Sequence, residues 1–294
     1  MAVQCLTWQH QYIETNDIRL HFVTQGEGEL VILLHGFLEF WYSWRRQIPN
    51  LARHFKVVVP DLRGYNDSDK PKTGYDLDTL TRDIQGLIKN LGYQKAYLVG
   101  HDFGGTLAWN MAQRFPNMVH RLAVLNAPHP RQFVQELASN MDQLRRSWYL
   151  LACQLPGLPE WVIRQNLHRI VKALFQDQSV RKGAFTATDA EIYQAALEKP
   201  GVIAAALSAY RQLFAPPSLF RLIGRSPDPV QMPTLILWSE EDSLLSHDLV
   251  RGFETLVAAP LELKLVSHCG HWIQQEAPQT VNRELLHFLR QSIG

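Results

Sequence analysis

The stretch LVGHDFGGTLAW (residues 98–109) joins an apolar run to the start of a helical pattern through a polar pair and two glycines. Small residues at Gly100, Gly104 and Gly105 are typical of a nucleophile elbow, a sharp strand-to-helix turn in which crowding around a reactive side chain excludes larger residues. The familiar elbow carries a serine in its middle, but this one carries Asp102. The stretch therefore predicts a strand, a tight turn and a helix, with a carboxylate at the position of the nucleophile.

Short, continuously apolar runs alternate with helical patterns along most of the chain. Because strands buried on both faces of a parallel sheet are apolar throughout, these runs predict parallel strands. Helical periodicity is found at 77–92 and 104–115, and a closing helix begins at about Pro278. Repeated strand–helix–strand units indicate an α/β fold with a mostly parallel, doubly wound sheet. The predicted strands are 30–36, 55–61, 96–102, 121–127, 234–242 and 261–271.

The middle of the chain differs from its two ends. From about Pro128 to Pro233 the patterns are helical, and two proline-rich segments, NAPHP (126–130) and RSPDPVQMP (225–233), bracket the region. We expect residues 1–128 and 231–294 to form the α/β core, and residues 129–230 to form a helical cap inserted into it. Ligands bind beyond the carboxyl ends of the strands in open α/β sheets, so such a cap would cover the site.

Composition narrows the class of protein. The chain has 294 residues, 46% of them hydrophobic, and 29 basic against 28 acidic side chains give a net charge of +1. This balance offers no electrostatic reason to expect binding to nucleic acid or to an anionic membrane surface. The first residues do not resemble a signal peptide, and no window suggests a membrane span. Three widely separated cysteines, Cys5, Cys153 and Cys269, fit a reducing compartment. We therefore expect a cytoplasmic protein.

Two residues late in the chain complete a catalytic pattern with Asp102. WSEED (238–242) places Asp242 at the end of one predicted strand, and SHCGHW (267–272) places His271 after the next. The order nucleophile, acid, histidine is that of the triad found on α/β-hydrolase scaffolds. Two alternatives stay open at this point. Asp242 could instead cap a helix, with Glu240 or Glu241 as the partner, and His271 could be an ordinary structural histidine.

Two other chemistries have less support. Cys269 could suggest a thiol nucleophile, but a lone cysteine without the glycines of an elbow is more often a small buried hydrophobic residue. A metal site built from His35, His101 and His271 lacks any recognised ligand spacing. We therefore expect no metal and no cofactor.

An aspartate at the elbow indicates attack on a saturated carbon. A carboxylate is ionised at neutral pH without help from a base, and its product is an ester, which water can cleave, whereas serine would give a stable ether. The histidine would then activate water to hydrolyse that ester. Backbone N–H groups of Phe37 and Phe103 are the expected oxyanion hole. A halide or an epoxide oxygen is the leaving group in such chemistry, and only the epoxide oxygen needs a proton donor.

Two tyrosines in the helical middle region are candidate proton donors. Tyr149 lies in QLRRSWYLLACQLPG (143–157), and Tyr210 lies in GVIAAALSAYRQLF (201–214) at helical spacing from Ile203, Leu207 and Phe214. A phenol is protonated at neutral pH, so either could donate a proton to an epoxide oxygen. Spacing alone favours the alternative that both are packing aromatics.

The motifs together resemble those of the α/β-hydrolase-fold epoxide hydrolases. The similar segments follow in the family's order over nearly the whole chain. This resemblance implies an α/β-hydrolase fold with Asp102 as nucleophile, His271 as base, Asp242 as its orienting acid, and Tyr149 and Tyr210 as ring-opening proton donors. The segments are HGFLEFWYSWRRQIPNLA (35–52), DLRGYNDSDKP (61–71), VGHDFGG (99–105), SWYLLACQLPG (147–157), LSAYRQ (207–212), WSEED (238–242) and CGHW (269–272).

Two positions depart from the family pattern. Leu38 stands where the family usually has a proline that shapes the oxyanion loop. Of the roles that the resemblance implies, that of the Phe37 N–H is therefore the least secure. Asn66 stands where glycine is usual, and we expect asparagine to be tolerated because it adopts a left-handed backbone more readily than most residues.

Rival functions share the same scaffold. Haloalkane dehalogenases typically carry Trp and Asn where this chain has Phe103 and Phe37, and fluoroacetate dehalogenases carry arginines where it has Phe103 and Thr106. A lipid esterase would need serine at position 102. A non-catalytic ligand-binding protein stays possible because a fold does not fix a function.

The expected partners are water and a small hydrophobic epoxide, with no nucleic acid. The expectation of an apolar substrate rests on the aromatic side chains near the motifs, which are Phe37, Phe40, Trp41, Trp148 and Trp272.

Overall fold

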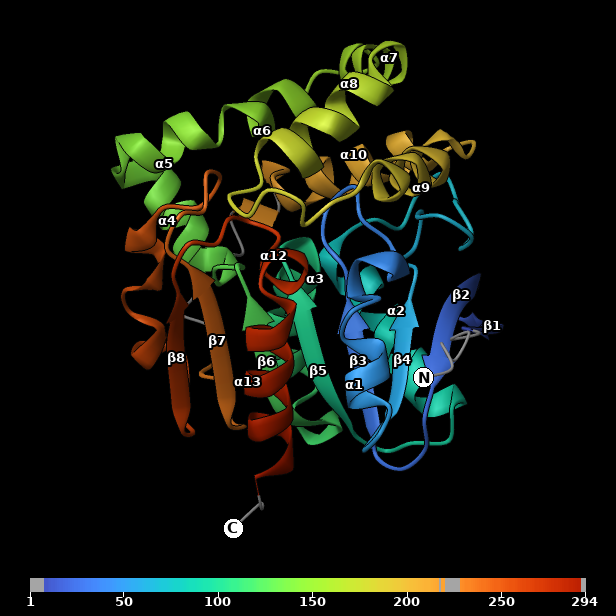
Figure 1. Ribbon diagram of the computed structural model, residues 1–294, viewed down its shortest axis with the longest axis vertical. Coiled ribbons are helices and arrows are strands. Elements are labelled where there is room, and N and C mark those ends of the chain that lie inside the picture. Colours follow the sequence, from blue (N-terminus) through green and yellow to red (C-terminus); the bar gives the residue numbers. More distant parts are fainter. Residues whose placement is uncertain (1–7, 217, 220–227, 292–294) are drawn as a thin grey trace.

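A single mixed sheet organises the protein. The computed structural model describes residues 8–216, 218–219 and 228–291, so Cys5 and residues 225–227 of the second proline-rich segment lie outside the described residues. Within this part, eight strands form one sheet in the order β1-β2-β4-β3-β5-β6-β7-β8 (Figure 1). The predicted α/β fold is confirmed.

All six predicted strands are present, and they are buried as expected of a parallel sheet. Strands β3 to β8 pair in parallel, except that the β4 edge also meets β2 in antiparallel fashion. Five of the six contain mainly buried residues, while β8 at the sheet edge is partly exposed. Their bounds are β3 Leu30–Leu34, β4 Lys56–Pro60, β5 Ala96–His101, β6 Val119–Leu125, β7 Thr234–Ser239 and β8 Leu261–Val266.

An N-terminal hairpin was not anticipated from the sequence. Strands β1 (Gln9–Thr15) and β2 (Ile18–Gln25) pair antiparallel and extend the sheet beyond β4. Asn16 and Asp17 form the turn with φ values of 46° and 62°, a left-handed conformation that Asn and Asp tolerate. The short TND segment was the signal for this turn.

Helices cover both faces of the sheet. Helix α2 (Leu77–Asn90) begins at Asp76, whose side chain accepts a hydrogen bond from the Thr79 N–H. Figure 1 shows α13 crossing in front of the sheet and α3 behind it. The remaining helices of the core are α1 Ile48–Leu51, α3 Phe103–Arg114, α12 Ile273–Glu276 and α13 Pro278–Arg290. None of the described helices is both long and apolar enough to cross a membrane.

A group of helices between β6 and β7 lies over the carboxyl ends of the strands (Figure 1). We call α4 to α10 the cap helices. A π-helical turn at Lys172–Asp177 interrupts them after α8. Their bounds are α4 Pro130–Ser139, α5 Met141–Arg146, α6 Trp148–Cys153, α7 Leu158–Gln165, α8 Leu167–Val171, α9 Ala187–Glu198 and α10 Val202–Leu213.

Close packing explains the glycines of the elbow. A Cβ on Gly104 would lie 2.3 Å from the backbone oxygen of Leu34, and one on Gly100 would lie 2.4 Å from the backbone oxygen of Gly104. These atoms are backbone, so they cannot move aside as a flexible side chain could. The strand, turn and helix therefore fit together only when these positions lack a side chain.

Substitution of Gly104 by alanine is expected to destabilise the protein by about 3 kcal/mol or more, because the overlap forces β3 and α3 apart. Gly92→Ala is a suitable control, since its φ is 84° but no atom lies within 4 Å of the added Cβ. That control is expected to cost only about 1 kcal/mol from backbone strain. Urea unfolding midpoints of the two variants would separate the effects, and equal losses would contradict the packing argument.

Candidate active site

Asp102, Asp242 and His271 meet at the carboxyl ends of three strands. Asp102 directly follows β5, Asp242 follows β7, and His271 lies in the loop after β8. The Nδ1 of His271 is 2.8 Å from Asp242 Oδ2, and its Nε2 is 3.6 Å from Asp102 Oδ2. The imidazole therefore lies between two carboxylates, which is the arrangement expected from their order in the chain.

The backbone at Asp102 has the geometry of a strained turn. Its φ of 49° and ψ of −120° are unusual for a residue with a side chain. Asp102 immediately precedes α3, so the carboxylate also lies at the positive end of a helix dipole. The turn lifts the side chain out of the sheet towards the cap helices, where both cavities described below expose it.

One predicted oxyanion donor already contacts Asp102. The Phe37 N–H donates a hydrogen bond of 2.7 Å to Asp102 Oδ1, so Oδ2 is the oxygen that faces His271. Phe103 is the first residue of α3, where backbone N–H groups have no partner within the helix. Leu38 has a φ of 57°, a value that proline cannot adopt. The loop thus presents the Phe37 N–H to Asp102 with leucine at position 38.

Charge determines the protonation of the triad. Burial alone would raise the pKa of Asp102, but the hydrogen bond and charge of His271, together with His101 and the Phe37 N–H, hold it below its ordinary value. Burial would lower the pKa of His271, but the charge of Asp242, with help from Asp102, raises it well above its ordinary value. Both shifts favour the charged forms, a carboxylate at Asp102 and an imidazolium at His271.

Backbone donors fix the orientation of Asp242. Its Oδ1 accepts hydrogen bonds from the N–H groups of Leu244 and Leu245, at 2.8 and 3.0 Å, which leaves Oδ2 for His271. The sequence also allowed Asp242 to be a cap, and these two hydrogen bonds show that it does cap the turn that follows it. Glu241 instead pairs with His268 on the surface.

The two candidate tyrosines come from different helices of the cap and line the same two cavities as Asp102. Tyr149 comes from α6 and Tyr210 from α10. The Tyr210 ring is 4.2 Å from that of Phe37 and 5.7 Å from that of Phe103, centroid to centroid. Burial first, and then the charge of Asp102, raise the pKa of both phenols. Both tyrosines are therefore protonated at neutral pH and placed near the candidate nucleophile.

Asp102 lies where two cavities meet. A cavity of about 440 Å³ extends under α6, α7 and α8, and one of about 40 Å³ extends towards α4. Three residues line both cavities: Asp102, Tyr149 and Tyr210. Outside the site residues the wall of the larger cavity is apolar. These three residues are thus at a junction, with a large apolar chamber on one side and a narrow pocket on the other.

The aromatic wall is only partly the one expected from sequence. Phe37, Trp148 and Trp272 line the larger cavity. Phe40 and Trp41 do not belong to either wall, so the expectation for these two was wrong. They are buried in the core, where Phe40 packs on Tyr193 and Trp41 on Trp8. The sequence shows that a residue is aromatic, but not which side of a loop it faces.

A buried carboxylate behind the triad was missed. Glu39 Oε2 accepts a 2.8 Å hydrogen bond from the Gly36 N–H and lies 2.9 Å from His101 Nδ1, and Oε1 accepts bonds from Gln274 and Gln275 at 3.2 Å. The Nε2 of His101 is 2.9 Å from the backbone oxygen of His271. Glu39 therefore links the oxyanion loop to the loop that carries His271.

Glu39→Gln is expected to lower stability by about 2 kcal/mol and turnover several-fold, because an amide NH₂ cannot accept from the donors that surround this side chain. The expected loss is mainly in kcat, since Glu39 lies behind the cavities and not in their walls. Glu241→Gln, at an exposed pair with His268, is the matched control with an expected change under about 0.5 kcal/mol. Urea unfolding and steady-state kinetics would test both, and a Glu39 variant as stable as the control would contradict the argument.

Asn126 is a second residue that the sequence did not reveal. Its side chain donates to the backbone oxygens of Gly270 and His271, at 3.2 and 2.8 Å, and accepts from the Ser239 N–H at 2.8 Å. It sits just after β6 with a φ of 42°. These hydrogen bonds connect the end of β7 to the loop that carries His271, and so help to hold the imidazole beside Asp242.

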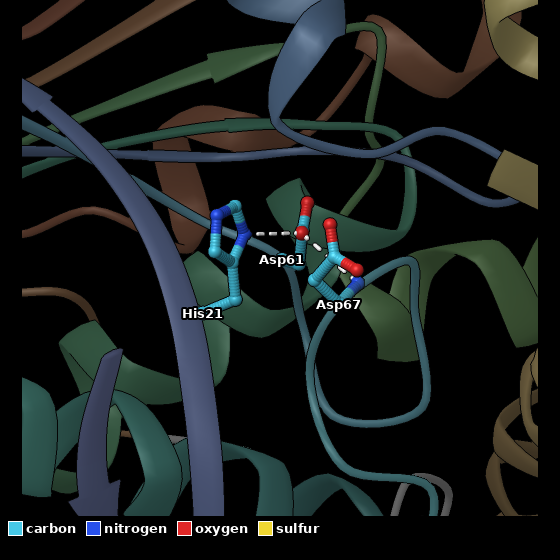
Figure 2. A group of neighbouring side chains, drawn as sticks. All are labelled: His21, Asp61 and Asp67. Atoms are coloured by element: carbon cyan, nitrogen blue, oxygen red, sulfur yellow. Dashed lines mark hydrogen bonds and ion pairs between the residues drawn. The ribbon is translucent and has the colours of Figure 1, made fainter. Parts of the chain in front are cut away.

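Candidate metal ligands are occupied by hydrogen bonds. Figure 2 shows His21, Asp61 and Asp67 together, with His21 Nδ1 2.6 Å from Asp61 Oδ2. Asn66 donates to the same oxygen at 2.8 Å, and Lys199 pairs with Asp67 at 2.6 Å. A lysine and a protonated ring nitrogen suit this cluster to hydrogen bonding within the chain rather than to a cation. The φ of Asn66 is 40°, so this position needs the left-handed backbone expected there.

The histidine set considered from sequence is also engaged. His35 Nδ1 is 3.0 Å from the backbone oxygen of Gly36, and its Nε2 accepts from the Leu62 N–H at 3.0 Å. His101 lies between Glu39 and the His271 backbone, as described above. These rings point to different partners rather than to one common point.

Comparison with known proteins defines the class. The model of the α/β hydrolase fold family matches residues 29–278. Epoxide hydrolase 4 of Mus musculus is 37% identical over 292 residues, which covers 96% of this chain and 80% of that protein. The AB hydrolase superfamily protein YfhM of Bacillus subtilis (strain 168) is 37% identical over 287 residues, covering 95% of this chain and 97% of that protein.

A solved structure agrees. The epoxide hydrolase of Bacillus megaterium in complex with an inhibitor aligns with a TM-score of 0.88 at 34% identity, covering 96% of this chain and all of that one. Together with the elbow, the triad geometry and the sheet order, these matches define an α/β hydrolase. Within that class the chain belongs to the epoxide hydrolase family. The resemblance drawn from the motifs is thereby confirmed.

Proposed function

We propose that this protein converts an apolar epoxide to a vicinal diol through a covalent ester on Asp102. The observation that supports the proposal is that two tyrosines, Tyr149 and Tyr210, line both cavities together with the elbow carboxylate Asp102. A leaving halide would call for N–H donors, whereas an epoxide oxygen needs a proton, which a phenol supplies. The relatives named as epoxide hydrolases support the same chemistry.

In the first step Asp102 Oδ2 attacks a ring carbon of the epoxide, and the bond from that carbon to the ring oxygen breaks. The ring oxygen takes a proton from Tyr149 or Tyr210 and becomes a hydroxyl group. The His271 imidazolium restores the lost proton to the phenol. Esterification also removes the negative charge that helps to raise the pKa of His271, so the imidazole is neutral for the next step.

In the second step neutral His271 takes a proton from water, and the resulting hydroxide attacks the ester carbonyl of Asp102. Negative charge develops on the Oδ1 side, where the Phe37 N–H donates 2.7 Å away and the Phe103 N–H lies at the helix start. In the collapse of this intermediate the bond from Asp102 Cγ to the alkyl oxygen breaks, and that oxygen takes the proton of the added hydroxyl group and leaves as the diol. Asp102 is then again a carboxylate, and His271 keeps the proton taken from water. Each oxyanion donor of this kind contributes roughly 10²–10³ in rate.

Residues 129–230 act in this proposal as a cap that shields the junction from bulk water and supplies both phenols. The apolar chamber of about 440 Å³ favours a hydrophobic substrate, and the chemistry requires no metal or cofactor. Partners beyond the epoxide and water are not needed.

A single turnover in ¹⁸O-labelled water tests the proposal. With enzyme in excess over an aryl epoxide, the first diol released is expected to be largely unlabelled, because its new oxygen comes from Asp102. Label then appears in the diol of later turnovers, since water oxygen replaces the carboxylate oxygen. Labelled diol in the first turnover would mean that water attacks the epoxide directly. No diol from a panel of epoxides would redirect the work to halide release and then to ligand binding.

Removing one phenol is expected to slow ring opening. Tyr149→Phe and Tyr210→Phe should each lower the rate of enzyme alkylation by about 10²-fold, and the double variant should lose it almost entirely, because general acids contribute roughly 10²–10⁴. Stopped-flow measurement of the alkylation step checks this, with Tyr193→Phe as a control that removes a buried phenol bonded to Gln275 away from Asp102. A double variant that still opens the ring would show that another group donates the proton.

A further inference from the structure

The cap helices carry a concentrated row of exposed apolar side chains. Of the eleven large hydrophobic side chains that are strongly exposed in the described part of the chain, eight lie on or beside α5, α6 and α7. In Figure 1 these helices form the upper edge of the molecule, away from the sheet. A concentration of exposed apolar side chains on successive helices is typical of an interaction site. We call this set the crown: Met141, Leu144, Trp148, Leu151, Leu155, Leu158, Trp161 and Val162.

The crown is continuous with the larger cavity. Trp148, Leu155, Leu158 and Val162 are exposed to solvent and also line the chamber that reaches Asp102. At these residues the apolar wall of the chamber therefore continues into the apolar outer surface. Whatever covers the crown also faces the way into the site.

Positive charge borders the crown. Among the described residues, four exposed cations on or next to α5, α7 and α8 take part in no ion pair, whereas the carboxylates on these three helices are paired, Asp142 with Arg146 and Glu160 with Arg211. The net charge of +1 is summed over the whole chain, so it does not reveal this local excess of positive charge or predict binding to an anionic surface. The four cations are Arg145, Arg164, Arg169 and Lys172.

We propose that the crown docks on the surface of an anionic lipid bilayer, so that the chamber opens towards the acyl chains and takes its epoxide from them. Trp148 and Trp161 with aliphatic neighbours are suited to the boundary between headgroups and acyl chains, and the bordering cations are suited to acidic headgroups. A protein partner seated here would seal the chamber, whereas a bilayer is the phase in which a lipophilic epoxide dissolves. Docking itself is independent of the proposed reaction, and only the uptake step rests on it.

Vesicle binding tests the docking. The protein is sedimented with vesicles of phosphatidylcholine alone and of phosphatidylcholine mixed with phosphatidylglycerol, and binding is expected to be stronger to the anionic vesicles and to weaken with salt. The test variant is Met141→Gln/Leu151→Gln/Trp161→Gln, since none of these three residues lines a cavity. Its partition is expected to fall about tenfold or more.

A matched control uses exposed apolar residues elsewhere. Leu263→Gln/Leu265→Gln changes two exposed leucines on β8 and is expected to bind vesicles as the unaltered protein does. Arg164→Gln/Arg169→Gln is expected to lose the preference for anionic vesicles. Absence of vesicle binding by the unaltered protein, or equal binding by the crown and β8 variants, would overturn the proposal. A dimer in sedimentation velocity that the crown variant alone converts to monomer would instead assign the crown to a second copy.

Turnover separates docking from chemistry. The crown variant should hydrolyse a short water-soluble epoxide at the unaltered rate, and should lose about tenfold in rate on a long-chain epoxide presented in anionic vesicles. Equal rates on the vesicle-borne substrate would overturn the uptake step. Loss of the proposed function itself would be recognised differently, since the unaltered protein would then turn over neither epoxide while still binding vesicles.

Discussion

Asp102→Asn is expected to abolish diol formation, with a fall in kcat of about 10⁴-fold or more, because a neutral amide cannot form the ester on which both steps depend. The substitution preserves the size of the side chain in the crowded elbow, so folding should survive. Asp102→Ser is expected to be equally inactive, since an ether formed at serine would not be cleaved by water. Steady-state kinetics with circular dichroism as a check on folding measures the effect.

Asp102→Asn is also expected to change how the free energy of unfolding depends on pH. In the unaltered protein the raised pKa of His271 contributes stability that is fully present below the unfolded pKa of about 6.5 and is lost as pH rises through the folded value. The lowered pKa of Asp102 contributes stability that is present above about pH 3.8 and is lost as pH falls further. Both contributions are complete only between these limits.

Asp102→Asn removes the second contribution and reduces the first, because His271 loses one of its two carboxylate partners. The urea midpoint should therefore depend less on pH than in the unaltered protein, and the imidazole should titrate at a lower pH when followed by NMR. An unchanged His271 titration would contradict the charge coupling between these two residues. Asp67→Asn, which breaks an exposed pair with Lys199, is the control for a change of one surface charge.

Local pattern is sufficient for the parts of this protein that are local. The elbow at 98–109 predicts a turn because close contacts between β3, β5 and α3 require its glycines. The six core strands are apolar because the sheet is covered on both faces. The order of Asp102, Asp242 and His271 predicts their meeting because the carboxyl ends of parallel strands share one edge of the sheet. Sheet topology thus converts sequence order into proximity.

The parts that were missed depend on contacts between distant segments. Glu39 is an unremarkable acid in the sequence, and its role follows from Gln274 and Gln275, more than two hundred positions away. Phe40 and Trp41 follow Phe37 by three and four positions, but their side chains pack in the core and do not line the chamber. Helical spacing predicts an apolar face around Tyr210, but only its packing against Phe37 and Phe103 places that face beside Asp102. Side-chain direction in loops and caps is a tertiary property.

His271→Gln is expected to stop the reaction after the ester has formed. Ring opening requires the Asp102 carboxylate and a phenol, so the variant should still form the ester, whereas hydrolysis requires a base for water and should slow by about 10³-fold or more. One equivalent of epoxide would be consumed per enzyme, and the intact protein would gain the mass of one epoxide. Intact-mass spectrometry before and after mixing measures this directly.

Two further variants make that result specific to the proposed roles. Asp102→Asn/His271→Gln should gain no mass, which would place the adduct on Asp102 rather than on another nucleophile such as a surface histidine. Asp242→Asn should accumulate the same ester, because the imidazole loses the carboxylate that holds its Nδ1 at 2.8 Å. If folded His271→Gln protein showed neither an adduct nor diol, His271 would be needed before ring opening, as the source of the proton that leaves through Tyr149 or Tyr210. The division of labour proposed for the triad would then have to be redrawn around the imidazolium rather than the base.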